Sequence, residues 1–526
     1  MHWTDIVTSP DVTEWSDVLI PRHPFDSNSH LAHQRRTARR RLTEAAEQYV
    51  LRLRNAAQSA GVNVPENRVF GSDSQIRPII MTGHQPIIFH SGITFKYECT
   101  EQVADGSAIG VSVTIDTDTG DPGMFRYPQT VPDTRQSESN QLVLTSATFA
   151  SSTGLYRSVE LLPAEQIAQQ TQLVTAELKS TATSGTQTQF CDISADYCRL
   201  AKIDVKAAEA NTIVRWSQGM GCRLLELPLS EICVFPEVLE LTASILEKHE
   251  LFAQAYNGCL ADYRNTHGIR NQANPFPELQ SDPEGTELPF WVLDDSSQTR
   301  HRAVVRRIRG AMTLFADGRS VETFPPGGSV EVLKNLLRQG IQLIPRGAMI
   351  TGFLRLLFAD LFVHGTGGGH YDQFTTEFLR SWWNVEPPPF VVASASRFLY
   401  EERHTELRTC QSLNEKLRDM QFNPQRQFGT GVFSEPVEAE LQRLCVQKEA
   451  EVAQLRFAQN TGQSAKDVGH RIQLLSNAIK TKVNDTFSEQ LTVLQNLTPE
   501  TQAAIECRTY PWFLFPAPSA GQSGKS

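Results

Sequence analysis

A strand, a helix and a second strand follow one another within about 40 residues, and this unit restricts the fold more than any other part of the sequence. Residues 78–82 form the apolar run PIIMT, and residues 92–104 carry a helical pattern. Residues 109–115 then alternate between apolar and polar side chains. Such units build parallel sheets that bind ligands beyond the carboxyl ends of their strands. The sequence therefore predicts an α/β fold with a ligand cleft.

The alternation of strands and helices returns late in the chain. Apolar runs at 341–344, 361–363 and 390–393 are predicted strands separated by helical segments. The prediction is a Rossmann-like, mostly parallel sheet with an inserted α+β region and a C-terminal antiparallel helical hairpin or coiled coil. The predicted division is an N-terminal helical segment (1–75), the first part of the α/β core (76–235), an inserted helix and β-hairpin region (236–328), the second part of the core with a glycine turn (329–398), a helical coiled-coil arm (399–500) and a tail that folds back (501–526).

Two long segments outside the core are also predicted to be helical. Residues 29–60 have strong helix formers and five arginines between positions 35 and 41, which we interpret as a solvated face rather than a phosphate contact. In the C-terminal arm, apolar residues step by three or four, which is typical of helices that pack on each other or across a homodimer. These residues include Ile472, Leu475, Ile479, Val483, Phe487, Leu491 and Leu494.

Composition excludes several classes of protein. The formal net charge of −10 disfavours nucleic acid as the main partner, because duplex binding needs a surplus of Lys and Arg. The nine cysteines include no C-x-x-C pair and are interpreted as reduced thiols. The first residues carry acids rather than a secretory signal, and no apolar run is long enough to cross a membrane. We therefore expect a soluble cytoplasmic protein with a small-molecule substrate.

The first half of the candidate site follows the strand at 78–82. Gly83, His84 and Gln85 precede the predicted helix, and His84 could bind a ligand, act as an acid or base, or simply tie down the loop. After the next strand come Asp116, Asp118 and Asp121. Three carboxylates so close together either hold a metal, a ribose or an amine, or build an Asx-rich turn.

The second half of the candidate site follows the strand at 361–363. His364 leads into the segment Gly365-Thr-Gly-Gly-Gly369, where glycines allow close approach of a ligand to the backbone near a helix start. The alternative is a purely structural tight turn. Further predicted binding residues are Gly367, Gly368, Tyr371, Asp372 and, after an earlier strand, Arg346.

The residues specify no cofactor. The glycine segment is compatible with a nucleotide, although it lacks the Gly-Lys-Ser/Thr ending of a P-loop and is not a clean G-x-G-x-x-G. A metal centre built from His84, Asp116, His364 and His370 has no diagnostic ligand spacing, so no metal is predicted.

Taken together, Thr82-Gly-His-Gln85, the acids from Asp116 to Asp121, the segment from His364 to Asp372 and the helical arm resemble the bacillithiol-biosynthesis cysteine-adding enzyme family. The resemblance implies a Rossmann-like core similar to class I aminoacyl-tRNA synthetases and nucleotidyltransferases, with inserted connecting domains and a coiled-coil arm used in dimerisation. It also implies a ligase that joins an amino acid to an amino-sugar. The chain has His84 where the family has Gln, and its acidic patch lacks the histidine of the family's Asp-His-Asp pattern.

Two functions follow as hypotheses. The first is a ligase or group-transfer enzyme that binds a small anionic or nucleotide-like substrate between the two turns, with His84, Asp116 and Asp118 as catalytic residues. The second is a non-catalytic scaffold or binding protein that assembles through its helical arm. The two turns must line a single cavity if the first hypothesis is correct.

Overall fold

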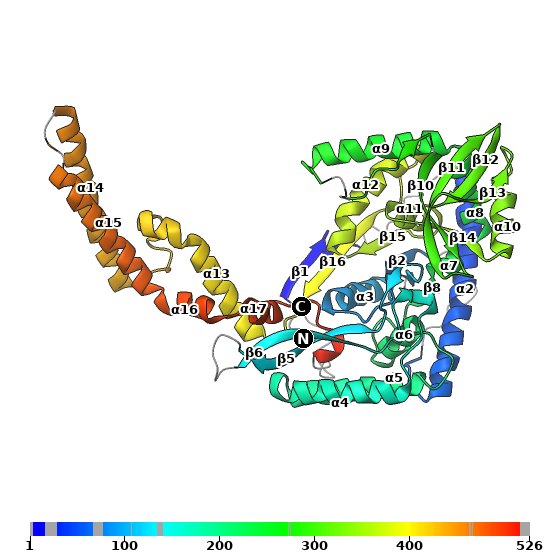
Figure 1. Cartoon of the computed structure of the whole chain (residues 1–526), viewed down its shortest axis with the longest axis horizontal. Helices are drawn as coiled ribbons and strands as arrows, with labels where there is room; N and C mark the ends of the chain where they lie inside the picture. Colours follow the sequence, from blue (N-terminus) through cyan, green and yellow to red (C-terminus); the bar gives the residue numbers. More distant parts are fainter. Residues whose placement is uncertain are drawn as a thin grey trace. The chain divides into compact units, whose positions relative to one another are not determined.

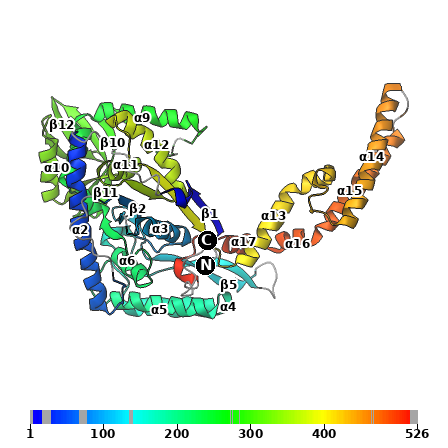
Figure 2. The same cartoon turned by 180° about the vertical axis from the view of Figure 1, so that it is seen from behind.

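Two compact units make up the chain (Figure 1), and Figure 2 shows the same elements from behind. The computed structural model describes residues 4–15, 29–66, 77–106, 108–133, 140–271, 273, 275–283, 285–461, 464 and 466–515. Unit 1 consists of residues 1–128, 145–397 and 508–526, and unit 2 of residues 129–144 and 398–507. Within the described ranges, no helix is both long and apolar enough to cross a membrane.

A six-stranded, mostly parallel sheet forms the centre of unit 1. Its strand order is β1-β16-β15-β2-β3-β8, and only β1 runs antiparallel to its neighbour. All residues of β3 and β15 are buried, as expected for parallel strands covered on both faces. The predicted α/β class with a mostly parallel sheet is confirmed. The strands are β1 (Thr4–Ser9), β2 (Ile79–His84), β3 (Ile109–Thr114), β8 (Leu225–Pro228), β15 (Leu361–His364) and β16 (Phe390–Ser396).

Several of the described helices pack against this sheet or against one another beside it. They include α2 (His30–Ala60), α3 (Ser91–Ala104), α11 (Ala348–Leu357) and α12 (Thr366–Trp383). The predicted helix at 29–60 is confirmed, with Ser29 as its N-cap and Gly61 in the left-handed region at its end. Its arginines are not all solvated: Arg35 is only 6% exposed, and Arg35 and Arg39 both pair with Asp360. These arginines therefore join α2 to the residues just before β15.

A second, antiparallel sheet has the order β13-β12-β11-β10-β14. The segment at 341–344 was predicted in the parallel core, but as β14 it pairs antiparallel with β10. The helix predicted in the inserted region 236–328 is two helices that meet at Lys248. The elements of this region are α8 (Pro236–Glu247), α9 (His249–Thr266), β9 (Ser281–Asp282), β10 (Gly285–Asp294), β11 (Thr299–Ile308), β12 (Ala311–Ala316), β13 (Arg319–Phe324), α10 (Ser329–Arg338) and β14 (Ile341–Pro345).

The remaining part of unit 1 includes the end of the chain and most of the connection from β3 to β8, of which residues 129–144 belong to unit 2. Phe513 is fully buried and packs against Phe125 and Phe190, so the described part of the apolar C-terminal segment folds onto unit 1. The predicted tail beyond residue 515 lies outside the described residues. The connecting elements are β4 (Thr119–Gly120), β5 (Met124–Pro132), β6 (Asn140–Thr148), β7 (Gly154–Leu155), α4 (Ala164–Thr181), α5 (Ser184–Leu200), α6 (Ala207–Ser217) and α7 (Leu229–Ile232), and β5 pairs with β6.

Unit 2 is mainly helical. A core that includes Met420, Leu441, Ile479, Val483 and Phe487 lies among its helices, so part of the predicted apolar stripe is buried. Helices α14 and α15 contact each other, while the antiparallel hairpin, the coiled coil and the dimer stay predictions. The helices are α13 (Glu401–Phe422), α14 (Glu435–Thr461), α15 (Lys466–Thr486), α16 (Ser488–Asn496) and α17 (Pro499–Ile505).

Candidate functional site

The two central strands of the parallel sheet, β2 and β15, end side by side. After β2 the chain continues to β3 and β8 on one side, whereas after β15 it continues to β16 on the other side. A crevice opens where the strand order reverses in this way, and ligands of open α/β sheets bind there. β2 ends at His84 and β15 ends at His364, which places the two predicted halves of the site next to each other.

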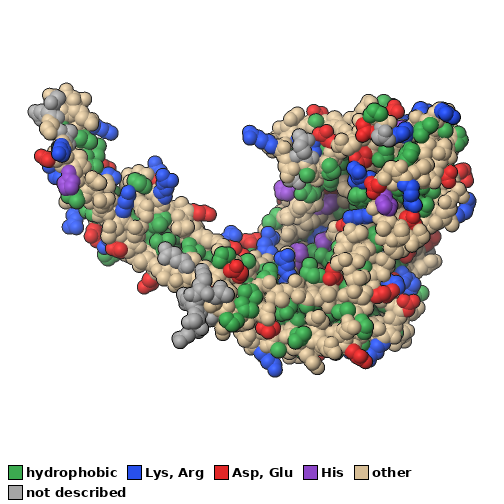
Figure 3. Space-filling view, viewed as in Figure 1, with side chains coloured by type: hydrophobic (Ala, Val, Ile, Leu, Met, Phe, Trp, Pro, Cys, Tyr) green, Lys and Arg blue, Asp and Glu red, His purple; other side chains and the backbone are tan. Residues whose placement is uncertain are grey.

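A cavity of about 630 Å³ lies at these strand ends. Its volume is within the range of sites that hold small molecules. Figure 3 shows that one face of unit 1 is hollowed, with His, Lys and Arg side chains gathered around the hollow. The second sheet supplies part of the cavity wall through Trp291 and Arg300, and Tyr256 and Phe276 add aromatic surface.

Most of the predicted site residues line this one cavity. They are Gly83, His84, Gln85, Asp118, Arg346, His364, Gly368, Tyr371 and Asp372. The predicted residues that are not part of its lining are Asp116, Gly365, Gly367 and Gly369. The two turns are thus brought together, but the acidic patch and the glycine segment contribute less than their sequences suggest.

His84 is uncharged at neutral pH. Burial lowers its pKa to about 3, and the nearby Lys96 acts in the same direction. Its Nδ1 lies 3.1 Å from the carbonyl oxygen of Gln85 and must donate there, because a carbonyl can only accept. This tautomer leaves Nε2 as an acceptor. His84 therefore offers a lone pair to a ligand hydroxyl or amine, while its Nδ1 contact ties down the loop, one of the roles that the sequence left open.

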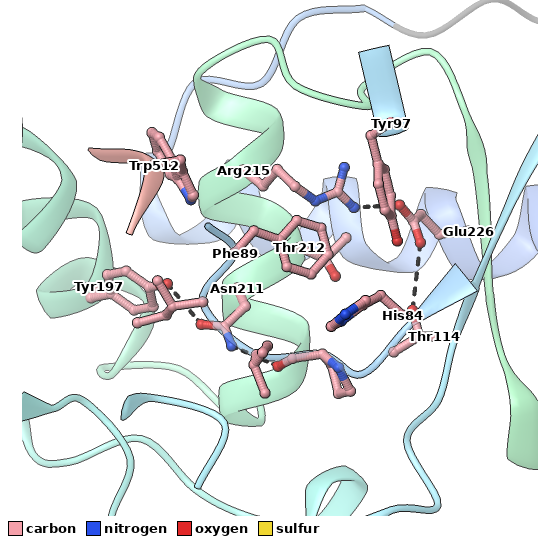
Figure 4. Close-up of a pocket in the computed structure, with 13 residues that line it drawn as sticks. His84, Phe89, Tyr97, Thr114, Tyr197, Asn211, Thr212, Arg215, Glu226 and Trp512 are labelled. Atoms are coloured by element: carbon pink, nitrogen blue, oxygen red, sulfur yellow. Dashed lines mark hydrogen bonds and ion pairs between the residues drawn. The ribbon is translucent and has the colours of Figure 1, made fainter. Parts of the chain in front are cut away.

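A second cavity of about 10 Å³, the size of one water molecule, is lined by His84 together with buried polar residues (Figure 4). Arg215 and Glu226 form an ion pair in its wall. Asn211 Nδ2 donates to the carbonyl of Pro86 at 2.7 Å and to that of Pro122 at 2.8 Å. These contacts fix the loop that follows His84. Sequence reasoning missed them because nothing in the α6 pattern marks Asn211 as different from an ordinary core-facing polar residue.

The three aspartates after β3 do not form a cluster. Asp116 is buried and accepts from the backbone N–H and hydroxyl of Ser230 at 3.0 and 2.5 Å, and its burial raises its pKa. Asp118 faces the cavity and accepts from Arg300 at 2.5 Å and from Gln85 at 3.2 Å. Asp121 caps a turn by accepting from the backbone N–H of Gly123. Asp116 therefore holds the start of α7, whereas Asp118 faces the cavity.

At the end of β15, Asp372 is the centre of a buried polar network. Its carboxylate accepts from Arg355 at 2.8 Å and from Thr351 at 2.7 Å, and it pairs with His364 Nε2 at 3.0 Å. Burial alone would raise the pKa of Asp372, but Arg355 and His364 lower it well below its ordinary value. The charge at this strand end is thus balanced within the protein.

The glycine segment is the first turn of α12 rather than a separate tight turn. The helix begins at Thr366, inside the glycine segment, and none of these glycines has a positive φ. A Cβ atom at Gly368 would lie 2.6 Å from His364 Nδ1, and one at Gly369 would lie 2.2 Å from Val392 Cγ2. A Cβ atom at Gly365 or Gly367 would meet nothing within 4 Å. Glycine is therefore required for close packing of α12 against the sheet at two of the four positions.

The second sheet contributes Trp291 and Arg300, which the sequence did not single out, beside the predicted Arg346. The guanidinium carbons of Arg300 and Arg346 each lie 4.8 Å from the ring centre of Trp291. Arg300 also pairs with Asp118, and Arg346 with the buried Glu287. Recognising this wall required the pairing of β10 with β11 and β14, which the sequence did not predict for β14.

Among the residues that the structure describes, no group of three or more His, Cys, Asp or Glu side chains is placed to hold a metal ion. No protein-family model matches the chain, and no curated protein matches it. The interpretation of the site therefore depends on its own geometry.

Proposed function

We propose that this protein is an enzyme with a Rossmann-like core that carries out ligation or group transfer on a small molecule bound at the ends of β2 and β15. The observation that supports the proposal is that two turns far apart in the sequence line one cavity of about 630 Å³. The reaction type follows the resemblance to the cysteine-adding enzyme of bacillithiol biosynthesis. The substrate would be anionic or nucleotide-like, and a nucleotide is the cofactor that we would test first.

The residues in the cavity wall suggest how such a substrate would be held. His84 Nε2 would accept a hydrogen bond from a hydroxyl or amine, which orients that group without taking its proton at neutral pH. Trp291 and Tyr371 would cover apolar faces of the ligand. Arg300 keeps a partner in Asp118 before any ligand binds, so an anion at this point must compete with that carboxylate.

A thermal-shift screen with ATP, AMP, amino acids and amino-sugars tests the proposal. A ligand at 100 times its Kd stabilises the folded state by about 2.7 kcal/mol. We expect this stabilisation in the wild type and in Gly367→Val, whose new side chain would point into open space. We expect its loss in Gly368→Val, whose side chain would collide with His364 in the cavity wall.

A second variant tests the proposal even if Gly368→Val does not fold. Tyr371 lines the cavity with a side chain that is 40% exposed, so Tyr371→Ala should fold and still weaken ligand binding. If no compound stabilises the wild type, or if the stabilisation is the same in all variants, the enzymatic proposal is wrong.

The scaffold function is the second candidate, and unit 2 supplies an observation in its favour. Val446, Phe457 and Leu474 are between 55% and 65% exposed on α14 and α15. Exposed apolar side chains on two helices that contact each other are what a helical dimer would bury. We propose that these helices form a homodimer. Light scattering should show a dimer that the double variant Val446→Glu/Phe457→Glu converts to a monomer, and a monomeric wild type would contradict this.

A further inference from the structure

Lys96 is a buried amine beside the candidate site, and none of the described acidic residues pairs with it. Its side chain is only 5% exposed, and its Nζ donates to the carbonyl oxygen of Gly83 at 2.8 Å. In the described part of the chain no carboxylate forms an ion pair with it. Gly83 itself lines the large cavity, so the charge of Lys96 lies one carbonyl group behind the cavity wall.

Other charged groups around the cavity have partners within the protein. Arg300 pairs with Asp118, Arg346 with Glu287, and Asp372 with Arg355. An ammonium that is buried without a counter-ion is costly, because burial removes its hydration. Among the described residues no carboxylate supplies this negative charge to Lys96, whereas an anionic ligand in the cavity would supply it.

The elements packed against α3 provide no substitute for that charge. β3 and β16 contain no titratable side chain, and on β15 the only one is His364, which is paired with Asp372. β2 contributes His84, and the N-cap of α3 is His90.

The neighbouring groups on these segments and on α3 itself are uncharged or paired elsewhere. Burial lowers the pKa of His84 to about 3 and that of His90 to about 4, and Arg508 adds to the effect on His90. Burial raises the pKa of the Tyr97 phenol above its ordinary value. Further along α3, Glu101 accepts from the backbone N–H of Arg223 at 2.8 Å.

Two further acids lie in this region, Glu98 on α3 and Glu226 in the wall of the small cavity. Burial raises the pKa of Glu98 to about 7, and Glu226 pairs with Arg215. Among the described residues, neither of them forms an ion pair with Lys96.

We infer that Lys96 is the counter-charge of an oxyanion subsite at the end of β2, where a carboxylate, phosphate or sulfate group of the ligand binds beside Gly83 and Lys96 takes up a proton as it binds. This inference rests on the proposed function, since it assumes that the large cavity holds the ligand. It also relocates the anion from the glycine segment at the start of α12, where the sequence placed it, to the start of α3. Lys96 acts across the Gly83 carbonyl as a positioning residue.

The physical reason for the proton uptake is burial. Burial lowers the pKa of Lys96 to about 7, so much of the amine is uncharged when the site is empty. A bound anion favours the ammonium form and raises this pKa again. Binding should therefore be coupled to protonation of one specific side chain.

Calorimetric titration of sulfate and, separately, of acetate at pH 7.5 in Hepes and in Tris tests the inference. The two buffers differ in ionisation enthalpy, and neither anion titrates near this pH, so the difference in heat measures protons taken up by the protein. We expect an uptake of roughly 0.7 proton per bound anion in the wild type, because about that fraction of an amine with this pKa is uncharged at pH 7.5. Comparing the affinities for sulfate and acetate shows whether the subsite prefers a tetrahedral oxyanion or a carboxylate.

Three variants assign the uptake. Lys96→Met should bind sulfate about tenfold more weakly with no uptake, and Lys96→Arg should bind it with no uptake because a guanidinium stays charged. The matched control is Lys179→Met, which removes an exposed lysine of α4 and should behave as the wild type.

The inference is overturned if Lys96→Met keeps the affinity and the proton uptake of the wild type, or if neither anion binds the wild type. Its failure can be told from failure of the proposed function. A ligand found by thermal shift that depends on Gly368 but not on Lys96 would leave the enzymatic proposal standing without this subsite. Sulfate binding that depends on Lys96, with no ligand found for the cavity, would leave this subsite standing and contradict the enzymatic proposal.

Discussion

The ends of the two central strands, β2 and β15, differ in how their charges are balanced. At β15, His364, Asp372 and Arg355 form a closed buried network that includes both signs of charge. At β2, His84, His90 and Lys96 are all bases, and no carboxylate of the described residues pairs with Lys96. The balanced end has what a stable fold needs. The unbalanced β2 end has no described carboxylate paired with Lys96. Such an excess of basic groups is expected of an anion-binding site whose ligand is not yet bound.

The largest expected effect comes from breaking the balanced end. Asp372→Ala leaves Arg355 and His364 buried without their shared carboxylate, and loss of one partner from a buried pair costs about 3–5 kcal/mol. Urea denaturation should show this decrease in the free energy of unfolding. Glu386→Ala is the control, because it breaks an exposed pair with Arg380 and should cost less than about 1 kcal/mol. Equal effects of the two substitutions would contradict the difference drawn between the strand ends.

The unbalanced end should respond in the opposite sense. Lys96→Met removes a buried amine that pairs with none of the described carboxylates, so at pH 7 the free energy of unfolding should rise by roughly 4 kcal/mol. The folded pKa is about 7 and the ordinary value is 10.5, so the unfolded chain binds more protons between these values. The wild type should therefore gain stability as the pH rises from 7 to 10.5, and Lys96→Met should lack that gain. Denaturation curves that shift equally with pH in both proteins would show that Lys96 is not buried as a charge.

Glycines at the balanced end give smaller effects of both signs. Gly369→Ala places a methyl group 2.2 Å from Val392 Cγ2, and overpacking of this kind costs about 1–2 kcal/mol. Gly367→Ala meets open space in a helix and should stabilise the protein by about 0.5–1 kcal/mol. Thermal melting of the two variants should shift in opposite directions. A gain in both would mean that α12 does not pack tightly on the sheet.

Much of the fold could be predicted from local pattern. Local residue pattern was enough to predict the helix at 29–60 and the strands β2, β3, β15 and β16. The helix has a helical spacing of apolar residues, and each strand has an apolar run or an alternating pattern. Residues 341–344 were assigned to the wrong sheet, because an apolar strand does not specify its partner. That partner, β10, lies far earlier in the chain.

The candidate site was predictable in position but not in chemistry. His84 and His364 could be placed at strand ends because polar residues directly after buried strands stand out. Asp116 and Asp118 look alike in sequence, yet one holds Ser230 and the other faces the cavity, and only the fold separates them. Lys96 resembles a surface lysine in sequence, because its burial depends on the sheet against which α3 packs.

The smallest expected effect concerns His90. It shows whether protonation of a second base at the β2 end, besides Lys96, destabilises the folded protein. His90 Nδ1 accepts from the backbone N–H of Gly92 at 3.1 Å, and burial with Arg508 and Lys96 nearby lowers its pKa to about 4 from an ordinary 6.5. The stability that neutral His90 contributes is complete above pH 6.5 and is lost as the pH falls toward 4, on the order of 1 kcal/mol by pH 5.5. His90→Asn keeps an acceptor for the helix cap and cannot titrate. Melting temperatures between pH 7.5 and 5 should therefore fall less steeply in His90→Asn than in the wild type. Parallel curves would mean that His90 is not part of the unbalanced end, and that the missing negative charge concerns Lys96 alone.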